Sequence, residues 1–265
     1  KRQDRIGAEL RVLRFFLRVR LQRRQLQRFR QLLPFLGSPI PSASIRPAGS
    51  WTPHGALATV FGMNPVEPAS SLLDDFSLEM TGKDVPALVE AQGLLPAGTR
   101  INVTFLGNED LPMRLAAASA VKAGGHVPVP HISARRLGSA AELEKFLGAL
   151  SEAGAVENVF VVAGDPAEPM GPYEDSLAVI ASGLPAAHGA RHISISGYPE
   201  GHPDIGEQTL WSALERKLAA VEDQGLDASI ITQFGFDTAP VLAWCEELRA
   251  RGIDAPVRIG VPGPA

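Results

Sequence analysis

The chain has 265 residues, of which 45% are hydrophobic and 20% charged, enough for one large domain of ordinary globular composition. Its net charge of −4 conceals a basic first segment and an acidic remainder, and the acidic part gives no sign of a nucleic-acid partner. With one cysteine, no internal disulfide can form, and no apolar run approaches the roughly 20 residues needed to cross a bilayer. We therefore expect a cytoplasmic protein without a membrane partner.

Residues 1–62 differ from the rest, with twelve Lys+Arg against two Asp+Glu. Leucines at helical spacing predict a basic amphipathic helix for a membrane surface or nucleic acid, and the excess of arginine also fits a transit peptide. A third interpretation is that this segment is not native protein, because the chain starts at Lys1 and the first methionine is Met63. We favour this third interpretation, in which residues 1–62 are an upstream read-through or a disordered extension and residues 63–265 are a truncated catalytic domain.

From Met63 onward, strand patterns alternate with helix patterns. Strands are predicted at 76–80, 101–107, 126–133, 157–163, 192–197, 228–234 and 257–261. Helices are predicted between them, at 84–95, 111–123, 139–153, 174–183, 207–224 and 238–251. This alternation predicts a parallel sheet with right-handed crossovers. Cys245 lies near Leu242, Trp244 and Leu248 in the last helix, where we expect a buried structural thiol.

Polar residues stand at the end of nearly every predicted strand: Glu79, Thr104, His131, Asp165, Tyr198 and Gln233. A doubly wound sheet usually has a Gly-rich turn after its first strand, whereas this chain has Glu79-Met-Thr-Gly82 there. Functional side chains drawn from many strand ends are typical of a (β/α)8 barrel. We therefore predict an α/β fold of the TIM-barrel type that is incomplete here, with about seven strands present.

The stretch from Glu157 to Pro166 shows how such a strand ends. An apolar run, Val159–Val162, leads to Gly164, where a ligand can approach the backbone. Asp165 is the first charged side chain beyond the strand, and it can face a cofactor or substrate. It can equally cap a turn or the next helix, and by itself the pattern favours that alternative.

The loop at residues 197–203, Gly-Tyr-Pro-Glu-Gly-His-Pro, is rigid in composition. Tyr198 can cover a planar ring, and His202 can donate a hydrogen bond to a phosphate. A metal site made by Glu200 with His202 is a weak interpretation, because no further ligand lies at metal-binding spacing. We prefer a binding function to a purely structural loop, and we predict no metal.

Two further residues suit chemistry on a flat heterocycle. Gln233 ends a strand before aromatic residues, so its amide can donate and accept at once, although it can also merely cap the sheet. Glu79 follows Phe76 and Leu78, and an apolar setting would raise its pKa and suit a general acid. A surface glutamate on a frayed strand is an equally good interpretation of that spacing.

Together these stretches resemble the methylenetetrahydrofolate reductase family over about residues 70–265. The specific motifs are Tyr-Pro-x-x-His-Pro at 198–203 and Thr-Gln-Phe-x-Phe-Asp at 232–237. The resemblance to this family implies a divergent bacterial-type, C-terminally truncated member with a flavin-containing TIM barrel. It implies that NAD(P)H reduces FAD, which then reduces methylenetetrahydrofolate to 5-methyltetrahydrofolate in one-carbon and methionine metabolism. Members of the family are often oligomers, so a homo-oligomer is an expectation from the resemblance alone.

The resemblance also implies roles for single residues. Glu79 matches the acid that helps open the folate's imidazolidine ring, Asp165 matches an aspartate beside the flavin and the pterin, and Gln233 matches a glutamine that contacts the folate. Flavin-binding positions are matched by Thr104, His131, Gly164, Asp165, Tyr198, His202 and Lys217.

The sequence departs from the family pattern at Ala163, where an arginine usually precedes Gly-Asp, so one flavin contact is missing. This departure motivates an alternative, a folate reductase of the same family that works without flavin. A non-catalytic folate- or flavin-binding relative is a further alternative, against which the joint presence of Glu79, Asp165 and Gln233 argues.

Overall fold

The computed structural model describes residues 75–262. The predictions made for residues 1–62, and for Met63 as the natural start, fall outside these described residues.

Residues 75–262 contain one parallel sheet whose seven strands lie side by side in chain order. The strands are β1 (Ser77–Met80), β2 (Arg100–Val103), β3 (Val127–Ser133), β4 (Asn158–Val162), β5 (His192–Gly197), β6 (Asp227–Thr232) and β7 (Val257–Arg258). Every neighbouring pair is parallel. Sequential order with parallel pairing is the topology of a (β/α)8 barrel, and this part of the chain forms seven of its strands. The predicted incomplete TIM barrel is confirmed.

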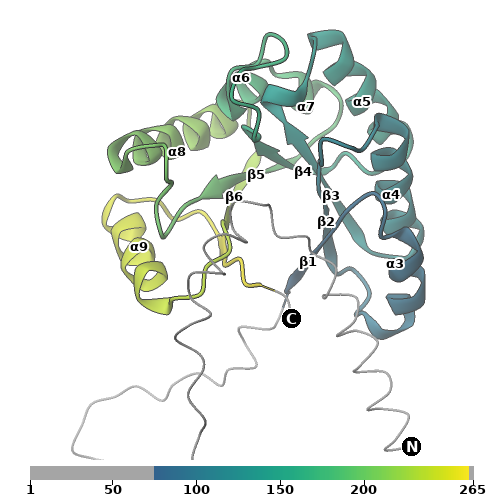
Figure 1. Cartoon of the computed structure of the whole chain (residues 1–265), viewed down its shortest axis with the longest axis horizontal. Helices are drawn as coiled ribbons and strands as arrows, with labels where there is room; N and C mark the ends of the chain where they lie inside the picture. Colours follow the sequence, from purple (N-terminus) through teal and green to yellow (C-terminus); the bar gives the residue numbers. More distant parts are fainter. Residues whose placement is uncertain (1–74, 263–265) are drawn as a thin grey trace, which may run out of the picture. The chain divides into compact units, whose positions relative to one another are not determined.

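Helices cover the outer side of the curled sheet (Figure 1). They are α3 (Val85–Ala91), α4 (Leu111–Ala123), α5 (Ala140–Glu152), α6 (Ser176–Ala181), α7 (Leu184–Ala187), α8 (Glu207–Glu222) and α9 (Thr238–Ala250), with 3-10 turns η3 (Gln92–Leu94) and η4 (Ala134–Arg136). The predicted helix at 174–183 is shorter than expected, and a second short helix follows it. The break occurs at Gly183, whose φ of 70° lies in the left-handed region and interrupts the helix.

Alternate side chains of each strand pack outward against these helices. The apolar members of this layer form one hydrophobic core, with Leu78, Met80, Ile101, Val103, Ile132, Val159, Val161, Ile193, Ile195 and Ile230. Since successive side chains of a strand point to opposite faces, the residues between them face the concave side of the sheet. That side carries mostly polar side chains, among them Glu79, Asn102, His131, Ser133, Ser194 and Ser229.

Side-chain caps start four of the helices. Asp110, Ser139, Asp175 and Asp237 each accept a hydrogen bond from a backbone N–H in the first turn of α4, α5, α6 and α9. A cap of this kind stabilises a helix by about 0.5–2 kcal/mol. Because Asp175 caps α6, Asp165 does not perform that role, and the capping alternative for Asp165 is wrong for this helix.

Some predicted boundaries are wrong. β2 ends at Val103, after which the Thr104 amide donates to the Met80 carbonyl (2.9 Å) and the chain leaves the sheet. β6 likewise ends at Thr232, so Gln233 lies just beyond its strand. Cys245 is half-buried rather than buried, because the outer side of α9 is open and leaves Leu242 63% exposed.

The two prolines of β3 are accommodated by uneven pairing. β3 pairs with β2 from Val127 to Pro130, but its pairing with β4 begins only at His131. Pro128 and Pro130 have no amide hydrogen to donate, so the ladder to β4 forms beyond them. His131 is therefore the first residue of β3 held by a strand on its β4 side.

Candidate active site

Three buried polar atoms at the carboxyl ends of β2 and β3 have no hydrogen-bond partner among the described residues: Thr104 Oγ1, His131 Nε2 and Ser133 Oγ. His131 and Ser133 lie on the same face of β3, and the register that pairs Val103 with Pro130 brings Thr104 beside His131. Buried polar groups almost always have partners, and each one left without a partner costs about 1–3 kcal/mol. Three such atoms side by side indicate a place where the polar atoms of a ligand complete the bonding.

His131 is held neutral and in a fixed orientation. Its side chain is 8% exposed, and burial lowers its pKa from 6.5 to about 3. Its ring meets the ring of Phe160 edge to face, with centroids 4.7 Å apart. A neutral imidazole whose buried Nε2 has no partner can exchange a hydrogen bond with a heterocycle without adding charge.

Gly164 follows β4 and packs directly against Ser133. Its φ is 98°, and a Cβ atom placed on it would lie 2.1 Å from Ser133 Oγ. Both the backbone conformation and the lack of space require glycine at this position. The loop after β4 therefore rests on the same end of β3 that carries the unpartnered atoms.

Asp165 stands next to Gly164 with its side chain 52% exposed. Its Oδ1 accepts a hydrogen bond from Nη2 of Arg136, in η4 at the end of β3. A carboxylate is thus presented beside the unpartnered cluster, and it is paired with a guanidinium from the neighbouring loop.

Glu79 lies between Leu78 and Met80, which both pack into the core, so its side chain points to the concave side. Its side chain is exposed to solvent, yet the protein around the concave side desolvates the carboxyl group and raises its pKa. Since water reaches the group, its pKa rises less than that of a sealed carboxyl. The raised pKa agrees with the predicted general acid, while the exposure does not agree with a buried setting.

The loops after β5 and β6 carry the other predicted binding residues. The rings of Tyr198 and His202 meet edge to face at 5.5 Å. His202 Nδ1 accepts a hydrogen bond from the Asp204 amide (3.1 Å), which leaves Nε2 as the nitrogen that can donate outward. Gln233 is exposed, and its Oε1 accepts from the Phe234 amide (3.3 Å), so a ligand would compete with a weak local bond.

Glu200, in the loop after β5, contacts the loop after β6. The sequence did not predict this contact. Glu200 Oε1 accepts a hydrogen bond from the Phe236 amide (3.2 Å), and a Cβ on Gly235 would lie 2.4 Å from the same oxygen. The Glu200 carboxylate therefore holds the loop of Gln233 against the loop of Tyr198. Within residues 75–262, no group of three or more His, Cys, Asp or Glu side chains is arranged to hold a metal ion.

Lys217 stands apart from the other predicted residues. It is 8% exposed on the inner face of α8, where burial lowers its pKa and the charge of Asp175 partly restores it. Asp175 is the cap of α6, so the structure places this lysine in the helix layer between α8 and α6. Its place among the flavin-binding residues remains a prediction.

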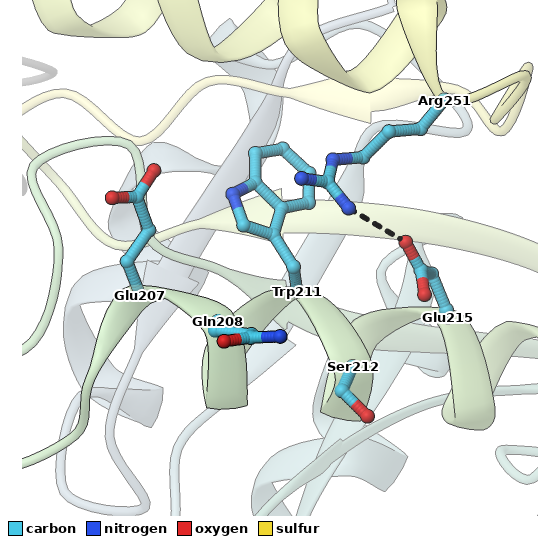
Figure 2. A pocket seen from close by; sticks show the side chains of 6 residues that line it. All are labelled: Glu207, Gln208, Trp211, Ser212, Glu215 and Arg251. Atoms are coloured by element: carbon cyan, nitrogen blue, oxygen red, sulfur yellow. Dashed lines mark hydrogen bonds and ion pairs between the residues drawn. The ribbon is translucent and has the colours of Figure 1, made fainter.

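A separate pocket of about 440 Å³ lies in the helix layer between α8 and the end of α9 (Figure 2). Its main side chains already have partners: Arg251 bonds to Glu215 (3.1 Å) and Glu247 (2.7 Å) and lies 4.5 Å from the Trp211 ring. Trp211 stacks in turn on Trp244. No predicted site residue lines this pocket, so we place the candidate site at the strand ends instead.

Sequence reasoning missed Ser133 and Arg136, and it considered Glu200 only as a weak metal ligand. Ser133 had a usable signal, since it lies two residues after His131 and so shares its face of the strand. Arg136 and the bond from the Phe236 amide to Glu200 had no such signal, because the bonded partners lie 29 and 36 residues apart along the chain.

Comparison with known proteins identifies the family. The family model for methylenetetrahydrofolate reductase matches residues 81–263, beginning just after Glu79. A 69-residue stretch is 36% identical to methylenetetrahydrofolate reductase 2 of Saccharomyces cerevisiae, covering 26% of this chain and 11% of that protein.

Likeness to solved structures is weak. A D-psicose 3-epimerase structure aligns at a TM-score of 0.36 and 13% identity, over 59% of this chain and 63% of that one. A metagenomic short-chain oxidoreductase aligns at 0.29 and 16% identity, over 71% and 99%. Neither likeness bears on fold or function.

In the part of the chain from 75 to 262, no helix has the length and apolar character to span a membrane. The family model matches more than half of the residues of this chain, and the chain therefore belongs to the methylenetetrahydrofolate reductase family.

Proposed function

We propose that this protein reduces 5,10-methylenetetrahydrofolate to 5-methyltetrahydrofolate with FAD as its cofactor and NAD(P)H as hydride donor, in cytoplasmic one-carbon metabolism leading to methionine. The observation that carries the proposal is the set of unpartnered buried atoms of Thr104, His131 and Ser133 beside Gly164. Family membership supports the reaction class.

The residues at the strand ends fit a flavin. Its ring edge offers both donors and acceptors, which match two hydroxyl groups and a neutral imidazole nitrogen. Tyr198 and His202 would hold the remainder of the dinucleotide, with His202 Nε2 free to donate to a phosphate. When bound, the flavin supplies hydride transfer, and the protein supplies orientation and local charge.

Acid–base work on the folate falls to Glu79. Its raised pKa keeps a larger fraction of the carboxyl protonated near neutral pH, so it can give a proton to the amine nitrogen that leaves as the folate ring opens. Gln233, whose side chain has only a weak local bond, would contact the pterin by donating and accepting together. Asp165 would face the reacting rings from the loop after β4.

The visible spectrum of the full-length protein tests this function. We expect an oxidised flavin band that NAD(P)H bleaches and that methylenetetrahydrofolate restores. A protein that stays colourless after addition of FAD but still reduces the folate would move the assignment to the flavin-independent alternative, with Ala163 as its motivation. A coloured or colourless protein without folate turnover would favour the non-catalytic alternative.

A further inference from the structure

Two consecutive arginines, Arg135 and Arg136, lie in η4 immediately after β3. Both guanidinium groups reach across to the loop that follows β4, which runs through residues 163–175 before α6 begins. The loop contains Asp165, so whatever holds the loop also places this carboxylate.

Arg135 holds the backbone of that loop. Its guanidinium donates to three carbonyl oxygens, those of Pro166 (3.3 Å), Ala167 (3.1 Å) and Glu174 (2.7 Å). Its own amide donates to the Ala163 carbonyl (2.8 Å), and its carbonyl accepts from the Met170 amide (2.9 Å). One residue thus ties down both ends and the middle of a segment that has no regular structure of its own.

Arg136 holds the carboxylate itself. Its side chain is only 17% exposed, and Nη2 bonds to Asp165 Oδ1. The guanidinium is packed so closely against Gly107 that a Cβ there would lie 2.4 Å from Nη1, and it lies 5.8 Å from the ring of Phe105. Contacts from the loop after β2 therefore hold the Arg136 guanidinium in place, and the more exposed Asp165 carboxylate bonds to this fixed group.

We propose that Arg135 and Arg136 are positioning residues for Asp165: Arg135 sets the course of the loop, and Arg136 fixes the carboxylate and balances its charge beside the cofactor. The proposal rests on the proposed function for what Asp165 faces, but not for how the loop is held. An isolated carboxylate disfavours the anionic reduced flavin, so a paired guanidinium is expected to reduce that effect.

Hydrogen–deuterium exchange of the flavin-free full-length protein tests the first half. Arg135→Gln removes three charge-assisted bonds to the loop's carbonyl groups, and we expect the Met170 amide, which donates to the Arg135 carbonyl, to exchange at least about tenfold faster because the loop is held less firmly. Arg216→Gln, on an exposed arginine of α8, is the matched control and should leave this segment unchanged. Unchanged protection of the Met170 amide in Arg135→Gln would overturn the role assigned to Arg135.

The flavin midpoint potential tests the second half. Arg136→Gln should shift the potential to more negative values, Asp165→Asn should shift it to more positive values, and Arg136→Lys should restore most of the first shift. In the Asp165→Asn background, the Arg136→Gln shift should be clearly smaller, because the part that comes from releasing the carboxylate is lost and only the guanidinium's own charge still acts on the flavin. An Arg136→Gln shift of equal size in both backgrounds would overturn the role of Arg136 in fixing the carboxylate. A protein that binds no flavin would instead contradict the proposed function, while the exchange experiment would still decide how the loop is held.

Discussion

The two ends of the sheet differ in how their polar side chains are hydrogen-bonded. At the amino ends of the strands, Asp75 bonds to Arg100 of β2 and Arg258 of β7, both at 2.6 Å. Deeper on the same concave side, Ser229 bonds to His192 Nε2 (2.8 Å) and to Ser194 (2.9 Å).

At the carboxyl ends of β2 and β3, the buried atoms of Thr104, His131 and Ser133 have no partner within residues 75–262. Polar groups that satisfy one another contribute to architecture, whereas a cluster of unpartnered polar atoms at the strand ends offers bonds that a ligand can complete. In barrels of this type the carboxyl ends carry function and the amino ends carry stability. Here the difference is one of degree: His126, just before β3, also has both ring nitrogens buried without a partner, but the cluster of three unpartnered side chains lies at the carboxyl ends.

The largest expected effect comes from Glu79 at the carboxyl side. Glu79→Gln removes the proton donor and should lower folate reduction by about 10²–10⁴-fold while NAD(P)H still reduces the flavin. The matched control is Asp227→Asn, which changes a carboxylate at the amino end of β6 and should leave turnover unchanged. Stopped-flow measurement of the two half-reactions separates these effects. Surviving folate turnover in Glu79→Gln would show that the acid is another group.

Two glycines with positive φ sharpen the comparison through stability. Gly164→Ala adds both backbone strain and a clash with Ser133, and it should destabilise the protein by about 2–4 kcal/mol in urea unfolding. Gly98 before β2 has a φ of 78° with open space around it, so Gly98→Ala should cost only about 1–2 kcal/mol. Equal losses would mean that the contact with Ser133 relaxes freely and that the carboxyl end is less tightly built than we infer.

Acid should destabilise the protein through His131. Its folded pKa of about 3 lies below its unfolded value near 6.5, so the unfolded chain takes up the proton first. The stability is complete above pH 6.5 and is lost as pH falls towards 3, by about 2 kcal/mol at pH 5. The pH dependence of unfolding should flatten in His131→Gln. His192→Gln, at the amino end, should flatten it less, because His192 is only half-buried. The reverse order would contradict the assignment.

The smallest effect is expected at the amino end. Burial alone would raise the pKa of Asp75, but hydrogen bonds and charges from Arg258 and Arg100 outweigh it and lower the pKa. Because this ion-pair group is largely exposed, Asp75→Asn should cost at most about 1 kcal/mol, and less at high salt. Folate turnover should not change. A marked loss of activity would show that the two ends of the sheet are coupled.

Much of the molecule followed from the sequence alone. Alternating strand and helix patterns determined a parallel sheet in chain order, because a helix that follows each strand returns the chain to the next parallel position and buries the apolar outer face of the sheet. The motifs around His131, Gly164, Tyr198 and Gln233 indicated the family and the edge of the sheet at which polar residues collect. These are local properties, readable from residue type and spacing.

Only the tertiary structure decided how those residues are held. Three contacts join segments that are far apart in the sequence, and no spacing rule predicts them. They are the pairing of Arg136 with Asp165, the bond from the Phe236 amide to Glu200, and the packing of Gly164 on Ser133. The neutral state of His131 depends on burial by neighbouring strands, and the exposure of Glu79 depends on how the sheet curls. Contacts between loops and the desolvation of single groups are set by the folded arrangement, which is why the sequence named the chemistry but not its geometry.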